Sequence, residues 1–418
     1  MHLTLLAVGS RGDVQPFIAL GLGLQKAGYT VRFATHSIFE ATIREAGLEF
    51  APLEGNPQAI VQGEEGRAWM ESERNPFKFA SGFRRLMGPV VRQAMQDALV
   101  ASEGTDGLII TGPAYYFGYS VAAKRNIPYV YAYLQPLHPT GEFPSALSPM
   151  SLPRNSVFNY LTHVVGGQMF WQLMRPIVNQ ARHDFLNLPP EPRQGSFPED
   201  MRRKIPVVYG YSPSVLPKPK NWGDFIHVTG YWFLDQPDWT PPQALVDFLQ
   251  AGSPPIYIGF GSMANRNPEQ MTEISLAALK KTNQRGLLLS GWGGITQADL
   301  PDTVFKIDAA PHDWLFPRMA ALVHHGGAGT TGVGLRAGKP TTIIPFFGDQ
   351  VFWGERVTAL GVGQAITRKQ LSADTLAAAI QKMVSDTGMQ GRAQALGEKI
   401  RSERGVENAA EIISRVMG

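Results

Sequence analysis

The sequence predicts an α/β protein built from two doubly wound parallel-sheet domains. Each half of the chain opens with an apolar run that ends in a glycine turn, residues 2–8 before Gly9 and residues 255–260 before Gly261. Runs that are apolar throughout are typical of parallel strands covered by helices on both faces. The length of 418 residues fits two or three domains.

Both halves continue the alternation of strand and helix. In the first half we expect helices over 16–28 and 38–46, because glycine, a common stop signal, ends each apolar pattern. Strands are expected between and after them, over 31–35 and 107–111. In the second half the expected strands are 286–290, 321–324 and 341–345.

A segment rich in proline and tryptophan, residues 215–242, separates the halves and predicts an interdomain linker. The N-terminal domain is then 1–214, the C-terminal domain is 243–395, and residues 396–418 form an amphipathic terminal helix. Ligands of such folds bind outside the carboxyl ends of the strands, so we expect them in a cleft between the two domains.

Composition excludes several classes of function. Cysteine is absent, which excludes disulfides, thiolate nucleophiles and cysteine-ligated metal sites, and fits a cytoplasmic protein. The net charge of +3 is too small to favour nucleic acid as a partner. Residues 155–174 carry no charge, but their amide side chains argue against a membrane span. We see no secretory signal in the first residues.

The strongest local motif is HHGGAGTT at residues 324–331, directly after a strand and at the start of a helix. Free amides at a helix start favour a pyrophosphate, and glycines let the backbone approach it. A simpler reading is that the glycines only make a tight turn. The sequence contains no Asp-x-Asp, which a metal-bridged diphosphate would favour, and no Walker motif. GxGxxG does not follow either opening strand, so a dinucleotide site has little support. We therefore expect chemistry that needs neither metal nor cofactor.

The motifs together resemble the sterol glucosyltransferases, which are UDP-dependent glycosyltransferases of the two-domain GT-B fold. The resemblance rests on ordered motifs over nearly the whole chain: GSRGDVQP at 9–16, TGYWFLD at 229–235, GFGSM at 259–263, SGWGG at 290–294, HDWLFP at 312–317, the 324–331 motif, and PFFGDQ at 345–350. Antibiotic-aglycone glycosyltransferases share the plan more loosely. The resemblance implies two Rossmann-like domains that face a cleft, with the last helix crossing back to the first domain.

The resemblance also implies an acceptor-binding N-terminal domain, a C-terminal domain that binds the UDP-sugar, and roles for individual residues. His325 would bind the donor diphosphate, and Asp349 and Gln350 would hold the sugar hydroxyls. His312 would meet the uracil, and Ser262 would meet the diphosphate from the other side. Further donor contacts are expected from Ser10, Arg11, Ala328, Gly329 and Thr330.

Asp13, in the first glycine turn, is the candidate general base for the acceptor hydroxyl, as the resemblance implies. A carboxylate cannot ionise an alcohol beforehand, so it must accept the proton while the new bond to carbon forms. The alternative from the residues alone is that Asp13 caps a helix that starts near Val14.

Apolar residues over 134–184 suggest an acceptor site, with Phe143, Phe158, Phe170 and Trp171 as candidates, although packing in a core explains them equally well. Basic and aromatic residues over 67–92 suit either a membrane surface or a solvated helix face. Trp292 suits a nucleoside contact or a core position. We interpret His36, His138 and His163 as satisfied or solvated side chains.

The leading hypothesis is an inverting, metal-independent transfer of glucose from UDP-glucose to a sterol or a similar flat apolar lipid, which gives a β-glucoside. The same chemistry on a polyketide, carotenoid or phenolic aglycone is the first alternative. A non-catalytic nucleotide-sugar or lipid sensor and a nucleotide-sugar epimerase are the others.

Overall fold

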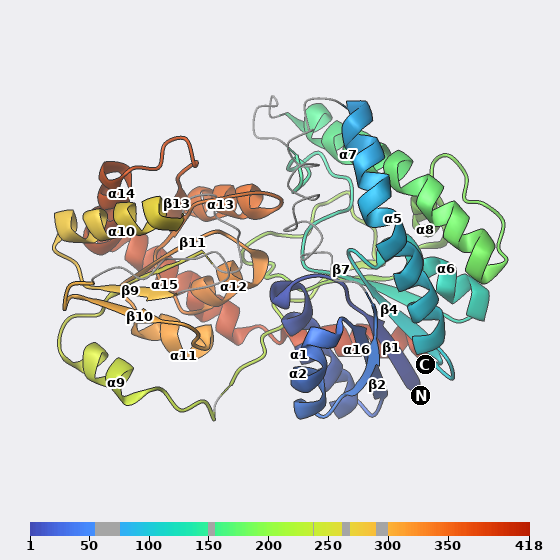
Figure 1. Ribbon diagram of the computed structural model, residues 1–418, viewed down its shortest axis with the longest axis horizontal. Helices are drawn as coiled ribbons and strands as arrows, with labels where there is room; N and C mark the ends of the chain where they lie inside the picture. The colour runs from blue at the N-terminus through green and yellow to red at the C-terminus, as the bar shows by residue number, and fades with distance from the viewer. Residues whose placement is uncertain (55–75, 149–154, 237, 261–267, 290–299) are drawn as a thin grey trace. The chain divides into compact units, whose positions relative to one another are not determined.

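The computed structural model describes residues 1–54, 76–148, 155–236, 238–260, 268–289 and 300–418, which fall into two compact units. Unit 1 comprises residues 1–211, 218–234 and 404–418, and unit 2 comprises residues 212–217 and 235–403. Each unit is a parallel sheet with helices packed on it (Figure 1). The predicted pair of doubly wound α/β domains is confirmed.

In unit 1 the described strands form a seven-stranded parallel sheet in the order β3-β2-β1-β4-β5-β6-β7. The strands are β1 (His2–Leu6), β2 (Thr30–Thr35), β3 (Glu49–Pro52), β4 (Gly107–Thr111), β5 (Tyr129–Tyr133), β6 (Val207–Tyr209) and β7 (Ile226–Val228). The helices are α1 (Arg11–Lys26), α2 (Glu40–Glu45), α5 (Pro76–Ala101), α6 (Tyr115–Arg125), α7 (Ser156–Ala181), α8 (Phe197–Arg203) and α16 (Gly405–Met417). Short 3-10 and π turns cover Ser37–Phe39 and Arg182–Leu186.

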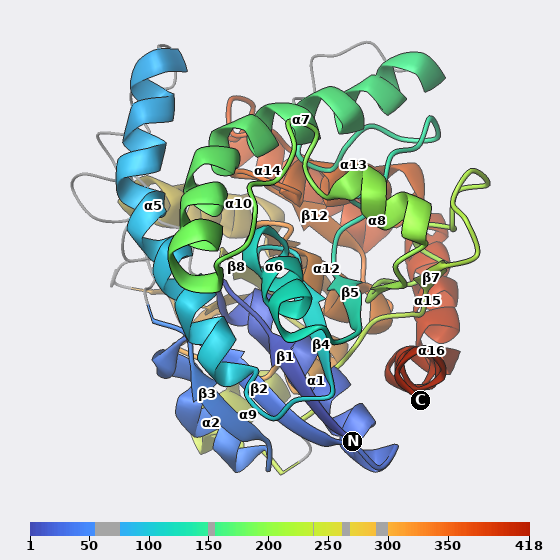
Figure 2. The ribbon, with the colours of Figure 1, turned by 90° about the vertical axis from the view of Figure 1, so that its right-hand side faces the viewer.

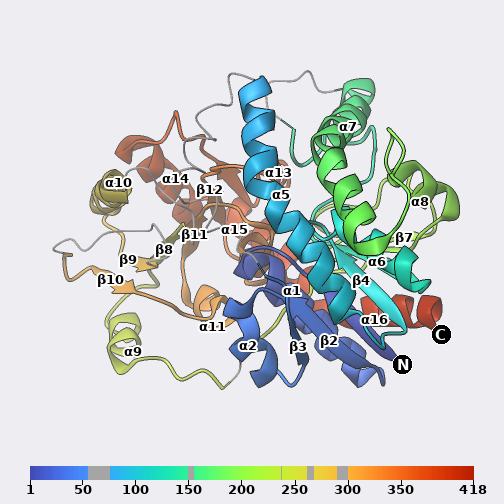
Figure 3. The same ribbon diagram turned by 45° about the vertical axis from the view of Figure 1, so that its right-hand side comes forward.

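The burial of the central strands of unit 1 explains why their sequences are apolar. Every residue of β4 and β5 is buried, as expected for strands that helices cover on both faces. The helix α5 packs on α6, and α7 lies outside them against α5, as Figures 2 and 3 also show. Elsewhere in unit 1, the last helix of the chain, α16, packs on α1.

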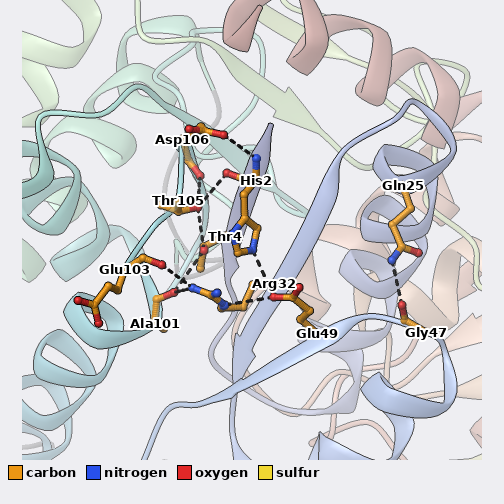
Figure 4. Close-up of polar contacts among 11 residues, drawn as sticks. His2, Thr4, Gln25, Arg32, Gly47, Glu49, Ala101, Glu103, Thr105 and Asp106 are labelled. Carbon is orange, nitrogen blue, oxygen red and sulfur yellow. Dashed lines mark hydrogen bonds and ion pairs between the residues drawn. The ribbon is translucent and has the colours of Figure 1, made fainter.

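A polar network joins the strands of unit 1 near their amino ends (Figure 4). The backbone N–H of His2 donates to Asp106 Oδ2 at 2.7 Å, and the Arg32 guanidinium donates to the carbonyls of Ala101 and Glu103, both at 2.8 Å. The carbonyls belong to the end of α5 and the turn after it. Because charge-assisted hydrogen bonds are strong, these contacts fix where α5 ends on the sheet.

In unit 2 the described strands form a six-stranded parallel sheet in the order β10-β9-β8-β11-β12-β13. The strands are β8 (Ile256–Gly259), β9 (Gly286–Leu289), β10 (Val304–Ile307), β11 (Ala321–His324), β12 (Thr341–Ile343) and β13 (Gly363–Ala365). The helices are α9 (Gln243–Gln250), α10 (Pro268–Thr282), α11 (His312–Leu315), α12 (Ala328–Arg336), α13 (Gln350–Ala359), α14 (Ala373–Ser385) and α15 (Thr387–Ser402), and a 3-10 turn covers Phe316–Arg318.

The sheet of unit 2 has a hydrophobic cluster on each face. Ile256 and Ile258 of β8 pack with residues of α10 and α14, whereas Tyr257 between them packs with Leu315 and Phe316. Alternate residues of a strand point to opposite faces, so both faces of the sheet are covered. Because both faces are covered, the loops that follow the strands lie at the carboxyl edge of the sheet.

The structure differs from the sequence prediction at the linker and at the C-terminus. Residues 218–234 of the expected linker belong to unit 1, where β7 adds a strand to the sheet, and residues 235–242 belong to unit 2. The single helix expected over 396–418 is interrupted: α15 ends at Ser402 in unit 2 and α16 begins at Gly405 in unit 1. The second helix begins where Gly405 lies against the backbone of Gly230 and Tyr231, which a side chain at this position would strike.

Among the described residues, no helix is both long enough and apolar enough to cross a membrane. The uncharged segment 155–174 lies in α7, which is part of unit 1.

The contact between α1 and α16 gives a test of the packing in unit 1. A Cβ at Gly23 of α1 would collide with Cγ1 of Val406, so we expect Gly23→Ala to cost about 1–3 kcal/mol of unfolding free energy by overpacking. In a Val406→Ala background the same change should stabilise by up to about 1 kcal/mol, since alanine is the better helix former. Urea unfolding of the four chains of this cycle measures both values. Stabilisation by Gly23→Ala in the otherwise unchanged chain would contradict the packing.

Candidate functional site

The first candidate loop follows β1 in unit 1. The helix α1 begins at Arg11 with Ser10 as its N-cap, so the helix expected over 16–28 starts earlier. Asp13 is therefore not the N-cap but the third helical residue. Its Oδ2 accepts hydrogen bonds from the Ser10 backbone N–H and from the Ser10 hydroxyl, both at 2.8 Å. Arg11 is exposed, and Ser10 and Asp13 are half-buried.

The environment of Asp13 adjusts its basicity. Burial raises the pKa of this carboxyl above its ordinary value, and the two hydrogen bonds from Ser10 oppose the rise. A raised pKa makes the carboxylate a better proton acceptor. Among the described residues both hydrogen bonds reach Oδ2, so Oδ1 is the oxygen that could take a proton from a ligand.

Gly9 and His36 hold this loop in place. The backbone of Gly9 has a φ of +140°, and a Cβ there would lie 2.5 Å from Asp13 Oδ2. The Gly9 N–H points to His36 Nε2 at 3.4 Å, and His36 Nδ1 lies 3.1 Å from the carbonyl oxygen of Leu53. Since Nε2 accepts, the ring proton belongs on Nδ1. His36 is buried and satisfied, as expected, and it links the carboxyl ends of β1, β2 and β3.

The second candidate loop follows β11 in unit 2. Gly327 is the N-cap of α12, and Gly326 before it has a φ of +92°. The Gly326 N–H donates to His324 Nδ1 at 3.0 Å, which places the proton of that buried ring on Nε2. The first turn of α12, from Ala328 to Thr330, has backbone N–H groups that a helix cannot satisfy internally. A Cβ at Gly329 would meet nothing within 4 Å, so there is open space beside this turn.

His325 lies against the same turn. A Cβ at Gly327 would lie 2.8 Å from His325 Nε2, so only glycine leaves room for the imidazole there. Burial lowers the pKa of His325 to about 4, and its Nδ1 is buried without a hydrogen-bond partner among the described residues. The ring is therefore neutral near pH 7 and can donate one N–H. An imidazole N–H close to the amides of a helix start can bind an anion.

Asp349 and Gln350 lie at the start of α13, next to the turn of α12. Asp349 Oδ2 accepts from the indole N–H of Trp353 at 2.9 Å. Gln350 Oε1 accepts from the backbone N–H groups of Phe346 and Phe347 at 2.8 and 3.2 Å. A Cβ at Gly326 would come within 3.2 Å of the Gln350 carbonyl oxygen, so the two loops touch. In this structure both side chains thus also shape their own loop.

His312, at the start of α11, belongs to the same edge of the unit 2 sheet. Its Nε2 lies 3.3 Å from the Tyr257 hydroxyl, and its ring stacks on Phe316 with 4.4 Å between centroids. Burial lowers the pKa of His324, and the neighbouring rings of His325 and His312 lower it further, so the three imidazoles are near neighbours. Ser262 and Trp292 lie outside the described residues.

The four acceptor candidates are not brought together. Phe143 and Trp171 are buried core residues: Phe143 packs edge-on against His163 and Trp222, and Trp171 fills the space that glycine leaves at position 195. Phe158 and Phe170 are 44% and 42% exposed on α7. Tertiary packing therefore separates residues that share one apolar segment. Of the basic and aromatic stretch 67–92, residues 67–75 lie outside the described part of the chain.

His138 and His163 are buried and hydrogen-bonded, as expected for satisfied side chains. The Tyr209 hydroxyl accepts the backbone N–H groups of Leu137 and His138 and donates to His138 Nδ1. Burial lowers the pKa of His138 to about 3, so this ring stays neutral. His163 Nε2 bonds the carbonyl oxygen of Phe143 at 3.1 Å.

Sequence reasoning missed a buried tyrosine cluster in unit 1. The hydroxyls of Tyr129 and Tyr131 donate to the two oxygens of Asp200 at 2.8 and 2.9 Å, and the Tyr115 hydroxyl lies 2.9 Å from Ser196 Oγ. Burial raises the pKa of Asp200, and the tyrosine bonds oppose this rise. The alternation of tyrosine in β5, YVYAY, was the signal, because it aligns three phenol rings on one face of the sheet.

The loop after β1 yields a matched test. Gly9→Ala should destabilise unit 1 by about 1–3 kcal/mol, because alanine disfavours a φ of +140° and its Cβ would meet Asp13. Gly12→Ala, three residues on in the first turn of α1, has only Ser10 Oγ at 3.7 Å to meet and should be neutral or slightly stabilising. Urea unfolding compares the two. Equal effects of the two substitutions would argue against the strained turn.

Two family models match the ends of the chain. Residues 3–105 match the glycosyltransferase family 28 N-terminal domain, and residues 293–416 match the erythromycin biosynthesis protein CIII-like C-terminal domain. Among solved structures, the fold is similar to the calicheamicin glycosyltransferase CalG4, with a TM-score of 0.71, 17% identity, and coverage of 100% of this chain and 98% of that one. It is also similar to the glycosyltransferase VinC in complex with DTDP, with a TM-score of 0.68, 16% identity and coverage of 100% and 99%. These likenesses establish the GT-B fold.

Curated relatives are closer in sequence. A sterol 3-beta-glucosyltransferase of Cryptococcus neoformans is 37% identical over 443 residues, which cover 99% of this chain and 27% of the relative. The chain thus spans about a quarter of this fungal protein. A sterol 3-beta-glucosyltransferase of Arabidopsis thaliana is 37% identical over 430 residues, which cover 99% of this chain and 68% of the relative. By this extent of similarity the chain belongs to the sterol 3-beta-glucosyltransferase family.

Proposed function

We propose that the protein transfers glucose from UDP-glucose to the hydroxyl of a sterol, with inversion and without a metal ion. The observation that carries the proposal is the turn before α12: His325 Nε2 lies against Gly327, His325 Nδ1 is buried without a partner among the described residues, and a Cβ at Gly329 would meet open space. Such a turn suits the diphosphate of a nucleotide sugar. The names of the curated relatives supply the acceptor class.

The departing diphosphate is stabilised within unit 2. As the bond between the anomeric carbon and the phosphate oxygen breaks, negative charge develops on UDP. The amides of the first turn of α12 and the N–H of neutral His325 donate to that charge, which lowers the barrier most where water is excluded. His312, at the same edge of the unit 2 sheet, would meet the uracil, while Asp349 and Gln350 would hold the sugar hydroxyls.

Unit 1 supplies the proton acceptor. The acceptor oxygen forms a bond to the anomeric carbon while its proton moves to the Asp13 carboxylate, and UDP leaves from the opposite side. A single displacement at an α-linked sugar gives a β-glucoside. The raised pKa of Asp13 favours this transfer, because the carboxylate is more basic than an ordinary aspartate.

UDP release tests the proposal directly. UDP-glucose is incubated with the protein in the presence of a chelator, with and without cholesterol, and free UDP and β-glucoside are measured. We expect sterol-dependent release and a β-linked product. Release that is equal without any acceptor would contradict transfer and indicate hydrolysis or epimerisation. Release that appears only when a divalent metal is restored would contradict metal independence.

Asp13→Asn separates catalysis from donor binding. The amide keeps a carbonyl oxygen for Ser10 but cannot accept a proton, so we expect turnover to fall by about 10²–10⁴-fold. UDP affinity, measured by calorimetry, should be nearly unchanged, because His325 and the amides of α12, which would bind the diphosphate, belong to unit 2. The exposed Asp224 provides the matched control, and Asp224→Asn should leave both values unchanged. Wild-type turnover in Asp13→Asn would remove Asp13 from the role of base.

A further inference from the structure

A cavity of about 350 Å³ lies in unit 1 between the strand β7 and the helix α16. One wall is formed by Lys218 and residues 226–229, and the other is the side of α16 that carries Asn408, Glu411, Ile412 and Arg415. We call this space the β7–α16 cavity. Its volume is at the lower end of the usual range for small-molecule sites, so it suits a small ligand.

The strand β7 presents its outer edge to the cavity. It is the last strand in the order of the described sheet, and β6 is its neighbour there. Because consecutive residues of a strand point to opposite faces, a cavity lined by Ile226, His227 and Val228 together lies at the edge of the sheet. The carbonyl of Phe225 and the N–H of Thr229 bond to β6. Parallel strands bond through alternate residues, so the N–H of Val228 faces the outer edge as a donor.

Contacts beside the cavity hold α16 against the segment that contains β7. The four residues that α16 contributes have the spacing i, i+3, i+4 and i+7, which places them on one side of the helix. Asn408 Nδ2 donates to the carbonyl oxygen of Thr229 at 3.0 Å. At the start of α16, Gly405 lies against the backbone of Gly230 and Tyr231. These contacts set the distance between the two walls, so the cavity is part of the fold of unit 1.

Three basic side chains line the cavity: Lys218 and His227 on one wall and Arg415 on the other. The Lys218 ammonium donates to the carbonyl oxygen of Gly223 at 2.9 Å, which is a neutral partner. The Arg415 guanidinium has no hydrogen bond or ion pair with another described residue. Burial lowers the pKa of His227, and the charges of Lys218 and Arg415 lower it further. Both cations therefore lie near the same imidazole.

Two carboxylates oppose this positive charge without cancelling it. Asp224 acts on His227 in the opposite direction to the two cations, and its effect on the pKa is the smallest of these charges. Glu411 lines the cavity, and its Oε1 lies 3.7 Å from Nη2 of Arg404, which is not a lining residue. Among the lining residues, two permanent cations thus stand against one carboxylate that is already paired. Such a cavity favours an anion.

We propose that the β7–α16 cavity binds the phosphate group of a small phosphate monoester, with Lys218, Arg415 and the N–H of Val228 as donors. Two permanent cations and an imidazole that can gain a proton suit a doubly charged anion better than a carboxylate. The apolar side chains of Ile226 and Ile412, which also line the cavity, contact the organic part of the ligand. All of these residues belong to unit 1, so the site is separate from the turn before α12 in unit 2.

The imidazole of His227 reports on the cavity without reference to activity. In an NMR titration of the full chain, phenyl phosphate should raise the pKa of His227, because a nearby anion favours the imidazolium. The signal is assigned by its loss in His227→Gln. Inorganic phosphate should bind more weakly than phenyl phosphate, since it has no ring to contact the apolar side chains. A pKa that changes no more with phenyl phosphate than with sodium chloride of equal ionic strength would overturn the proposal.

A pair of variants separates a site from general attraction by net charge. Arg415→Gln should weaken the binding of phenyl phosphate at least about tenfold, because it removes a charged donor. Lys220→Gln removes the same charge from an exposed residue that does not line the cavity, and it should leave binding unchanged. Without ligand, Arg415→Gln alone should raise the pKa of His227, since it removes one of the two nearby cations. Equal weakening of binding by both variants would contradict a site at Arg415.

A third variant separates this site from the anion-binding turn proposed in unit 2. We expect His325→Gln to leave the response of His227 to phenyl phosphate unchanged. If binding is instead lost in His325→Gln and the pKa of His227 never responds, the ligand binds in unit 2 and the inference fails while the proposed function stands. If His227 responds but sterol-dependent release of UDP is absent, the inference stands and the proposed function fails.

Discussion

In each unit, a buried imidazole accepts a hydrogen bond from a glycine N–H in the turn after a central strand. His36 Nε2 faces the N–H of Gly9 in unit 1, and His324 Nδ1 accepts the N–H of Gly326 in unit 2. Both glycines have a positive φ, which leaves their N–H groups pointing away from the ladder of the sheet. A ring nitrogen can accept such a bond only while it is unprotonated. In unit 2, burial lowers the pKa of His324 well below its ordinary value, which keeps this acceptor available.

These turns set the chemistry that each unit offers. In unit 1 the turn lets the Asp13 carboxylate fold back on Ser10 without a side chain at position 9 in its way. In unit 2 the turn directs the chain into α12 and leaves room for His325 against Gly327. In the proposed function the first arrangement provides the base and the second provides hydrogen-bond donors for the diphosphate. A displacement with a poor nucleophile and an anionic leaving group needs both.

The helix α7 illustrates how a fold can overrule an amphipathic pattern. Its apolar residues at helical spacing suggested a core or an acceptor site, since apolar faces usually turn inward. The structure instead buries Asn159 and His163 and exposes the apolar side along four turns. Hydrogen bonds to the backbone of residues 141 and 143 decide the rotation. Those carbonyls lie at least eighteen residues away in sequence, so no local pattern could have indicated them.

The sequence by itself determined the two parallel sheets, the order of their loops and the residue types at each carboxyl edge. Buried strands and glycine turns are local patterns, and parallel topology then brings the ends of neighbouring strands to one edge. Tertiary structure alone decided that the C-terminal segment breaks before Gly405, and that Phe143 is core while Phe158 is exposed. Each of these depends on contacts between segments far apart in the chain, which propensity and periodicity do not describe.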